Sequence, residues 1–215
     1  MREIRLSGSS LKVIAMVTMV IDHTACYFVN DGWEYECMRS IGRIAFPIFA
    51  FLISEGYRHT HKKWEYERNL LIFTFISEIP WMLLHTDGSY NVLFTLLAGL
   101  CCIAILDKLK NHKILPFLFV LVIALATSIL NTDYGIQGVV LVMMFYLFKD
   151  KPLIVLLFAL PLFYDFHPLG ILASFGLISL YNGERGFIKG AYSKFLFYAF
   201  YPCHLMVIWA LLLVV

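Results

Sequence analysis

Charged residues are scarce in this sequence. Only 15% of its 215 residues are charged and 60% are hydrophobic, whereas an ordinary soluble domain is about a quarter charged and about half apolar. So many apolar side chains cannot be enclosed in one core of this size, and the surface must therefore face lipid. The formal net charge of +2 and the lack of a long polar stretch leave no room for a separate soluble catalytic domain or a DNA-binding surface.

Several motifs of soluble enzymes are also missing. There is no glycine-rich phosphate loop of the P-loop or Rossmann type. The seven histidines are scattered and no cysteine pair faces them, which predicts that the protein binds no metal. No internal repeat is visible, which argues against a duplicated transporter fold. Any chemistry is therefore expected within or between membrane spans.

Apolar segments of spanning or near-spanning length alternate with short polar turns. This pattern predicts an all-α polytopic membrane helix bundle of about nine transmembrane helices, forming a single domain over residues 1–215. The sixth to eighth segments are short for a hydrocarbon core of ~30 Å, so one of them is alternatively a re-entrant or interfacial helix. The predicted spans are 12–30, 38–57, 68–85, 91–107, 113–130, 135–148, 152–165, 168–181 and 195–215.

The cations predict the orientation of the chain. With these spans, fifteen of the seventeen Lys and Arg residues fall on one side, and Lys and Arg are enriched in cytoplasmic loops. The two exceptions, Arg39 and Arg43, lie in the second span near the opposite face. We therefore expect a multi-pass protein of the inner (plasma) membrane, with a cytoplasmic N-terminus and an extracytoplasmic C-terminus.

Ionisable residues inside the spans are the most informative feature. An ionised side chain near the bilayer centre costs ~2.5–3.5 kcal/mol, so such residues usually face a protein interior and have a partner. Counting ~1.5 Å per residue from the cytoplasmic end places Asp22, Glu78 and His204 about 14–15 Å deep. Arg43 enters from the other face, and its long side chain reaches toward the same layer. We expect these four groups to meet in a reaction or transport site, with helix packing alone as the alternative.

Three further residues extend this predicted site. Arg39 lies four residues before Arg43, so it shares the same helix face and lines the outer part of the cavity. His23 follows Asp22 directly and therefore points about 100° away from it. Glu55 lies near the cytoplasmic end of the second span and is expected to mark the inner mouth.

Five sequence blocks resemble the signature blocks of the TraX family of membrane proteins. They are MVIDH (19–23), RSIGRIAFPIFAFLISEG (39–56), FISEIPW (75–81), NVLFT (91–95) and FYAFYPCHL (197–205). The resemblance implies a polytopic membrane acetyltransferase, because the family's named member acetylates the amino terminus of a conjugative pilin. The sequence is also similar to the wider group of transmembrane acyltransferases, which use cytoplasmic acyl-CoA. Many family members are not linked to conjugation, so the acceptor does not carry over.

Acyl transfer from a thioester to an amine or hydroxyl needs a base and a positive group where the oxyanion forms. The resemblance of the Asp-His block favours His23 as the base, with His204 as the other candidate and an acetyl-His intermediate as an alternative route. Asp22 or Glu78 then orients the base or holds an acceptor ammonium. Arg43 either stabilises the oxyanion or neutralises a carboxylate.

Acetyl-CoA or another acyl-CoA is the expected donor, and its phosphates need cations on the cytoplasmic side. The basic loop after the second span is the candidate, although positive-inside bias alone explains its charge. The acceptor is an amine or hydroxyl on a peptide, glycan or small molecule. The predicted donor-binding residues are Arg58, His59, Lys62, Lys63 and Arg68, and the predicted substrate-binding residues are Arg39, Glu55 and Asn91.

Two other functions fit the same charges. In a non-enzymatic transporter or proton-coupled carrier, the intramembrane groups form a substrate or proton relay. In an integral assembly factor, they only lock helix packing. Acyl transfer from labelled acetyl-CoA separates the enzyme from both.

Overall fold

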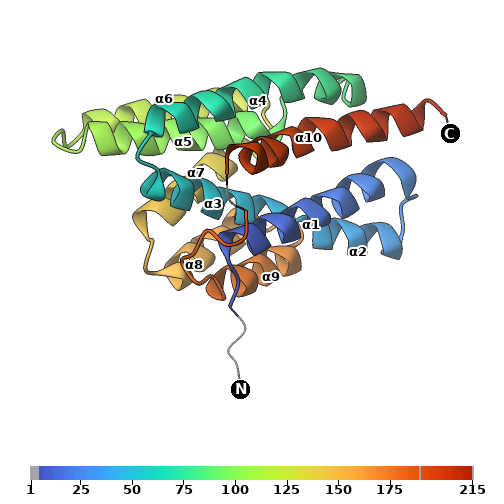
Figure 1. Ribbon diagram of the computed structural model, residues 1–215, viewed down its shortest axis with the longest axis horizontal. Coiled ribbons are helices and arrows are strands. Elements are labelled where there is room, and N and C mark those ends of the chain that lie inside the picture. The colour runs from blue at the N-terminus through green and yellow to red at the C-terminus, as the bar shows by residue number, and fades with distance from the viewer. Residues whose placement is uncertain (1–4, 189, 215) are drawn as a thin grey trace. The chain divides into compact units, whose positions relative to one another are not determined.

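The computed structural model describes residues 5–188 and 190–214, and its regular structure is helical (Figure 1). The prediction of an all-α chain is confirmed. Outside the helices, the described residues form two isolated β-bridges, Leu6 with Tyr181 and Tyr90 with Thr132. The helices are α1 (Gly8–Phe28), α2 (Trp33–Gly42), α3 (Ala45–His59), α4 (Lys63–Leu84), α5 (Val92–Lys108), α6 (Leu115–Ile129), α7 (Gly135–Leu147), α8 (Pro152–Leu162), α9 (Pro168–Ser179) and α10 (Ala191–Leu212).

The second predicted span is interrupted. Helix α2 ends at Gly42, Arg43 and Ile44 form a turn, and α3 begins at Ala45. Pro47 lies in the first turn of α3 and cannot donate a backbone hydrogen bond to the carbonyl of Arg43, so the ladder breaks there. The predicted second span is thus two helices, although Arg43 keeps a helical backbone and bonds its N–H to the Arg39 carbonyl, so the two arginines stay on one side as predicted. Taken together, α2 and α3 form one apolar stretch, Trp33–His59, which brings the described helices to nine segments.

The contacts group the chain into two compact units. One unit comprises Met1–Leu52 and Asp150–Val215, and the other comprises Ile53–Lys149. The first unit contains α1, α2 and α8 to α10, the second contains α4 to α7, and α3 begins in the first and ends in the second. The single transmembrane domain over residues 1–215 stays a prediction.

Helix termini follow local sequence signals. Ser7 caps α1, because its side-chain oxygen accepts a hydrogen bond from the Ser10 backbone N–H at 3.2 Å. Helix α2 carries Glu34 and Glu36 in its first turn, where the helix dipole favours negative charge. Asn91 caps α5 through the Leu93 backbone N–H at 2.9 Å.

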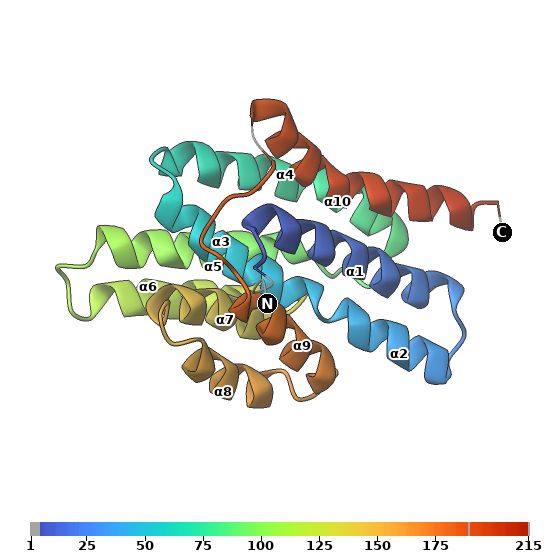
Figure 2. The ribbon, with the colours of Figure 1, turned by 60° about the horizontal axis from the view of Figure 1, so that its bottom comes forward.

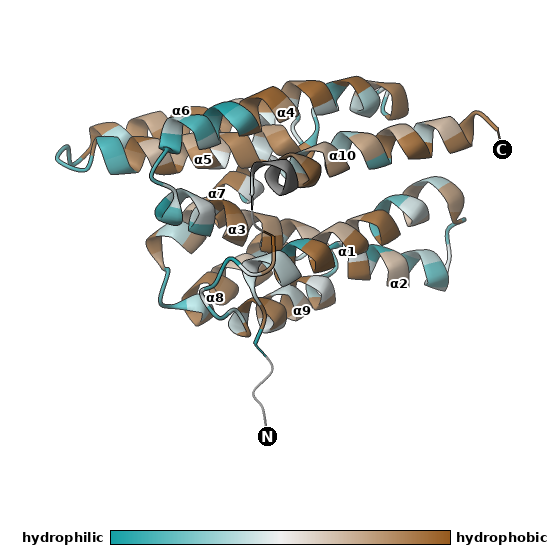
Figure 3. Cartoon of the chain, viewed as in Figure 1, coloured by the Kyte–Doolittle hydropathy of each residue, from teal (hydrophilic) through white to brown (hydrophobic). Residues whose placement is uncertain are grey.

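Many large apolar side chains are exposed. Figure 3 shows hydrophobic residues along most of the helices, with hydrophilic residues gathered mainly in the connections and at some helix ends. On α6, Phe117 is 58% exposed and Val122 is 65% exposed, as expected of a helix whose solvent is lipid. Among the described residues, Gly8–Phe28, Trp33–His59 and Phe195–Leu212 are long and apolar enough to cross a membrane. Several shorter apolar helices accompany them, so the chain has the character of a multi-pass membrane protein.

Helices α7, α8 and α9 contain 13, 11 and 12 residues, or only about 20, 16 and 18 Å at 1.5 Å per residue. They are therefore shorter than a hydrocarbon core of ~30 Å, as their predicted spans are. That nine segments cross the membrane, with the N-terminus inside, stays a prediction.

In the first unit, α1 lies between α2 and α10 (Figure 2). Glycine allows the close approach of α1 to α2, because a Cβ on Gly42 would lie 2.1 Å from Asp22 Oδ1. Gly170 of α9 similarly packs against the end of α2, where a Cβ would lie 2.2 Å from the Ser40 carbonyl oxygen. These contacts fix the part of α1 that carries the predicted catalytic residues.

Candidate functional site

Helix α1 presents two neighbouring ionisable residues to two different helices. Asp22 contacts Arg39 of α2, with 2.7 Å between Oδ2 and the guanidinium, whereas His23 contacts His204 of α10. Consecutive residues on a helix point about 100° apart, so the prediction that Asp22 and His23 need not share partners is confirmed. The result is an ion pair on one side of α1 and a histidine pair on another.

The two imidazoles form a direct hydrogen bond. His23 Nδ1 lies 2.7 Å from His204 Nε2, and the ring planes are inclined by only 13°. His204 is 9% exposed, and its other nitrogen, Nδ1, lies 3.1 Å from the Phe200 carbonyl oxygen. The Phe200 ring also stacks on His204, with centroids 5.0 Å apart, so this imidazole is held from both its edge and its face.

The ion pair on the other side of α1 includes a thiol. Arg39 donates to Cys26 Sγ at 2.7 Å as well as to Asp22, because Asp22 and Cys26 are four residues apart on one helix face. Arg43 also lies close enough to attract the Asp22 carboxylate, and its guanidinium lies 5.5 Å from the centre of the Phe166 ring. Of the four groups predicted to meet, Arg43 lies near Asp22, which Arg39 also contacts, whereas His204 faces His23 instead.

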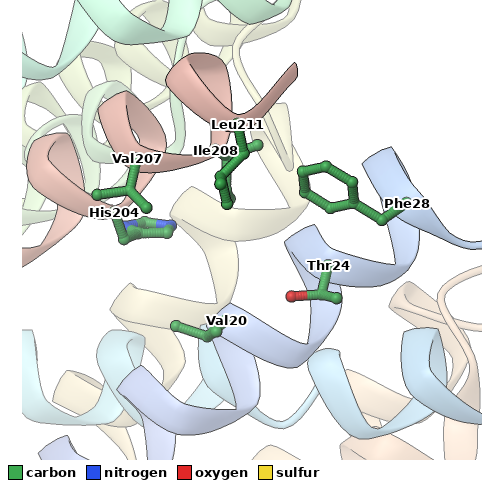
Figure 4. A pocket seen from close by; sticks show the side chains of 7 residues that line it. All are labelled: Val20, Thr24, Phe28, His204, Val207, Ile208 and Leu211. Carbon is green, nitrogen blue, oxygen red and sulfur yellow. The ribbon is translucent and has the colours of Figure 1, made fainter. Parts of the chain in front are cut away.

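An apolar pocket of about 470 Å³ adjoins the histidine pair (Figure 4). It lies between α1 and α10, and His204 and Thr24 supply its polar side chains. Its size falls within the range of small-molecule sites, about 300–1,000 Å³. The other residues that line it are Val20, Phe28, Val207, Ile208 and Leu211.

Glu78 lies in the other unit and makes a local network. Its Oε2 accepts hydrogen bonds from Asn91 Nδ2 at 2.6 Å and from the Asn91 backbone N–H at 3.3 Å. Asn91 also donates to the Thr74 carbonyl at 3.1 Å and accepts from Leu93 as the helix cap. The Asn91 side chain, predicted to bind substrate, is thus fully engaged in holding the start of α5, where a carboxylate is favoured by the helix dipole.

The helix bounds give the positions of the three residues that were predicted to share one depth in the membrane. Asp22, Glu78 and His204 lie 14, 15 and 13 residues after the first residues of their helices, or about 21, 22 and 20 Å along each axis. These values exceed the predicted ones because the helices begin four or five residues earlier than the predicted spans. The meeting of Glu78 with the other three groups stays a prediction.

Two members of the predicted donor-binding loop are bound to Glu55. Arg58 donates to Glu55 Oε1 at 2.5 Å and to the carbonyls of Phe145 and Tyr146 at the end of α7. His59 lies 3.2 Å from the other Glu55 oxygen and is 64% exposed at its side chain. Arg58 therefore holds α3 to the C-terminus of α7, and Glu55 is its buried counter-ion.

The lysines of the same loop are also paired with acids. Lys62 lies 2.8 Å from Glu65, and Lys63 donates to Asp107 at 2.5 Å. The hydrogen bond from Lys63 to Asp107 raises the pKa of the lysine above its ordinary value, so this cation stays charged at neutral pH. Arg68 is exposed on α4, which leaves His59, Lys62 and Arg68 as the more accessible basic residues.

Sequence reasoning missed the histidine pair and the thiol contact. It placed His204 beside Asp22 and gave His23 no partner, because depth along a helix does not tell which faces meet. Cys26 had an available signal, since any partner of Asp22 also meets the residue four positions later. Among the described residues, no three His, Cys, Asp or Glu side chains are grouped as metal ligands.

Two comparisons with known proteins match most of this chain. The sequence pattern of the TraX protein family matches residues 7–212. The chain is 30% identical to a probable fimbrial assembly protein, FimC of serogroup H1, from Dichelobacter nodosus, over 95% of both chains. It is also 33% identical to an uncharacterized protein of Rickettsia prowazekii over 43% of this chain and 35% of that protein. No solved structure matches.

Proposed function

We propose that this chain, which belongs to the TraX protein family, is an integral membrane acyltransferase. It moves an acetyl group from cytoplasmic acetyl-CoA to an amine or hydroxyl acceptor at an intramembrane site. One observation carries the proposal: the 2.7 Å hydrogen bond between His23 and His204 inside two apolar helices. Polar groups inside apolar helices are costly, so two imidazoles in direct contact there point to a functional site.

The histidine pair supplies the proton transfers that acyl transfer needs. His23 takes the proton from the acceptor amine or hydroxyl while the nitrogen or oxygen of the acceptor attacks the thioester carbonyl carbon. The tetrahedral intermediate then collapses, the carbon–sulfur bond breaks, and the same proton passes to the leaving sulfur. Atoms and charge balance without a metal or a redox partner.

The arginines supply positive charge for the oxyanion. Arg39 pairs with Asp22, the residue before His23, and Arg43 attracts the same carboxylate. A guanidinium keeps its charge in an apolar environment and donates several hydrogen bonds, so it suits an oxyanion that forms transiently. Asp22 orients Arg39 and offsets its charge when no substrate is bound.

The phosphates of the donor bind the accessible part of the basic loop. His59, Lys62 and Arg68 are the proposed contacts, because the donor groups of Arg58 are already used by Glu55 and by two carbonyls of α7. Lys63 acts as a structural cation through Asp107.

The acceptor is proposed as an amino group on a subunit of a surface fibre. The support is the relative that is named a probable fimbrial assembly protein and aligns over 95% of both chains. An exported subunit carries its amine on or within the membrane, where an intramembrane site can reach it. Hydroxyl acceptors on glycans are the second class to be tested.

Purified protein in lipid nanodiscs with radiolabelled acetyl-CoA tests the proposal. We expect label to appear on a subunit peptide or small amine with the wild type, and to fall by about 10²–10⁴ in His23→Ala. His112→Ala, an exposed histidine in the α5–α6 loop, is the matched control and should keep wild-type transfer. Substrate or proton uptake into vesicles that depends on the pair, without acyl transfer, would identify a carrier instead.

A further inference from the structure

The hydrogen-bond chain around His204 determines where its proton lies. Nδ1 of His204 is 3.1 Å from the Phe200 carbonyl oxygen, and a carbonyl only accepts hydrogen bonds. Nδ1 must therefore carry a proton. Pro202 lies two residues after Phe200 in the same helix. The Phe200 ring is stacked on the His204 imidazole and keeps its Nδ1 edge turned toward the helix backbone.

The proton on Nδ1 leaves Nε2 of His204 as an acceptor. A neutral imidazole carries one proton, and a second proton would place a cation in a buried position of an apolar helix, which is costly. The partner at 2.7 Å, His23 Nδ1, must then be the donor. His23 is consequently protonated at Nδ1, and its basic lone pair lies on Nε2.

We propose that His204 is a positioning residue, which fixes the tautomer of His23 so that Nε2 of His23 is the atom that takes the acceptor proton. This inference rests on the proposed acyltransferase function. When Nε2 is protonated, His23 becomes an imidazolium that still donates from Nδ1 to His204, so the hydrogen bond strengthens as charge develops. His204 keeps its own proton throughout. The hydrogen-bonded series from the Phe200 carbonyl through His204 to His23 thus orients the base, as a carboxylate orients the histidine of a Ser-His-Asp triad.

His23 is not among the residues that line the pocket next to the pair. His204 lines the pocket of about 470 Å³ between α1 and α10, yet both of its ring nitrogens are already used, by Phe200 and by His23. It therefore contributes a wall of the pocket. The proposed proton transfer by His23 rests on the two hydrogen bonds that fix the tautomers.

Nitrogen-15 NMR of histidine-labelled protein in nanodiscs tests the proton positions directly. We expect both His23 and His204 to be protonated at Nδ1 at neutral pH, with signals assigned by His23→Gln and His204→Gln. A wild-type His23 protonated at Nε2 would overturn the inference. This measurement needs no acyl-transfer activity.

Kinetics test the role itself. His204→Gln keeps a carbonyl oxygen that can accept from His23, whereas His204→Phe fills the same space without an acceptor. We expect His204→Gln to stay within about tenfold of the wild-type kcat, and His204→Phe to fall by about 10²–10⁴, as far as His23→Gln. His112→Gln is the control for histidine loss, and thermal unfolding shows whether each variant is folded.

Two kinetic outcomes contradict the proposal. If His204→Gln is as inactive as His204→Phe, the His204 imidazole itself reacts, and if His204→Phe is fully active, no positioning is needed. If the wild type transfers no acyl group to any acceptor, the acyltransferase proposal fails. The NMR result then still decides whether the predicted tautomers exist.

Discussion

The contact between Gly42 and Asp22 gives the sharpest test of how the site is built. A Cβ at position 42 would lie 2.1, 2.3 and 2.4 Å from Oδ1, Cβ and Cγ of Asp22. All three distances are far below a van der Waals contact, and Asp22 Cβ is fixed to the α1 backbone, so α1 and α2 must separate. Overpacking of this kind costs about 1–3 kcal/mol, and the separation also loosens Asp22 from Arg39.

We therefore expect Gly42→Ala to lower the unfolding temperature by about 2–12 °C, at about 2–4 °C per kcal/mol, and to reduce acetyl transfer. Tryptophan fluorescence during heating in detergent measures the first effect, and labelled acetyl-CoA measures the second. Gly176→Ala is the matched control, because a Cβ there meets nothing within 4 Å and alanine is the better helix former. If Gly42→Ala unfolds no earlier than Gly176→Ala, the described packing of Asp22 against α2 is wrong.

Three further predictions concern the other charged groups. Asp22→Asn and Arg39→Gln should each cost about 3–5 kcal/mol, because each removes the ion-pair partner of a side chain that is only 15% or 13% exposed. The double variant should lose less than the sum, and additive losses in thermal unfolding would disprove the coupling. Glu78→Ala should cost about 1–3 kcal/mol by leaving its buried asparagine partner without an acceptor, whereas Glu78→Gln should cost less, and equal losses would contradict this reading. Arg58→Ala should destabilise the protein by about 3–5 kcal/mol. Lys62→Ala should cost less than about 1 kcal/mol, because the Lys62 side chain is 75% exposed. A raised KM for acetyl-CoA in Arg58→Ala at unchanged stability would instead show that Arg58 binds the donor.

The sequence alone determined the environment and the order of the helices. Apolar runs of near-spanning length and scarce charge indicated a surface that faces lipid. Helices followed from this, because each backbone N–H and C=O in a bilayer must be hydrogen-bonded within its own segment. The helices accordingly fall close to the predicted spans. The break at Arg43 could also have been read from Pro47, whose missing N–H removes one hydrogen bond from the helix ladder.

The tertiary structure alone decided which side chains meet. A hydropathy pattern tells how far along its helix each residue lies. Which side chains contact one another also depends on how each helix is rotated and on which helix lies beside it. His23 and His204 are 181 positions apart, and Glu78 and Asn91 are separated by a helix end and a loop. The ionisable residues could be found from the cost of placing charge in lipid, but the pairing of His23 with His204 required the packed helices, because only packing brings two distant helix faces within hydrogen-bond distance.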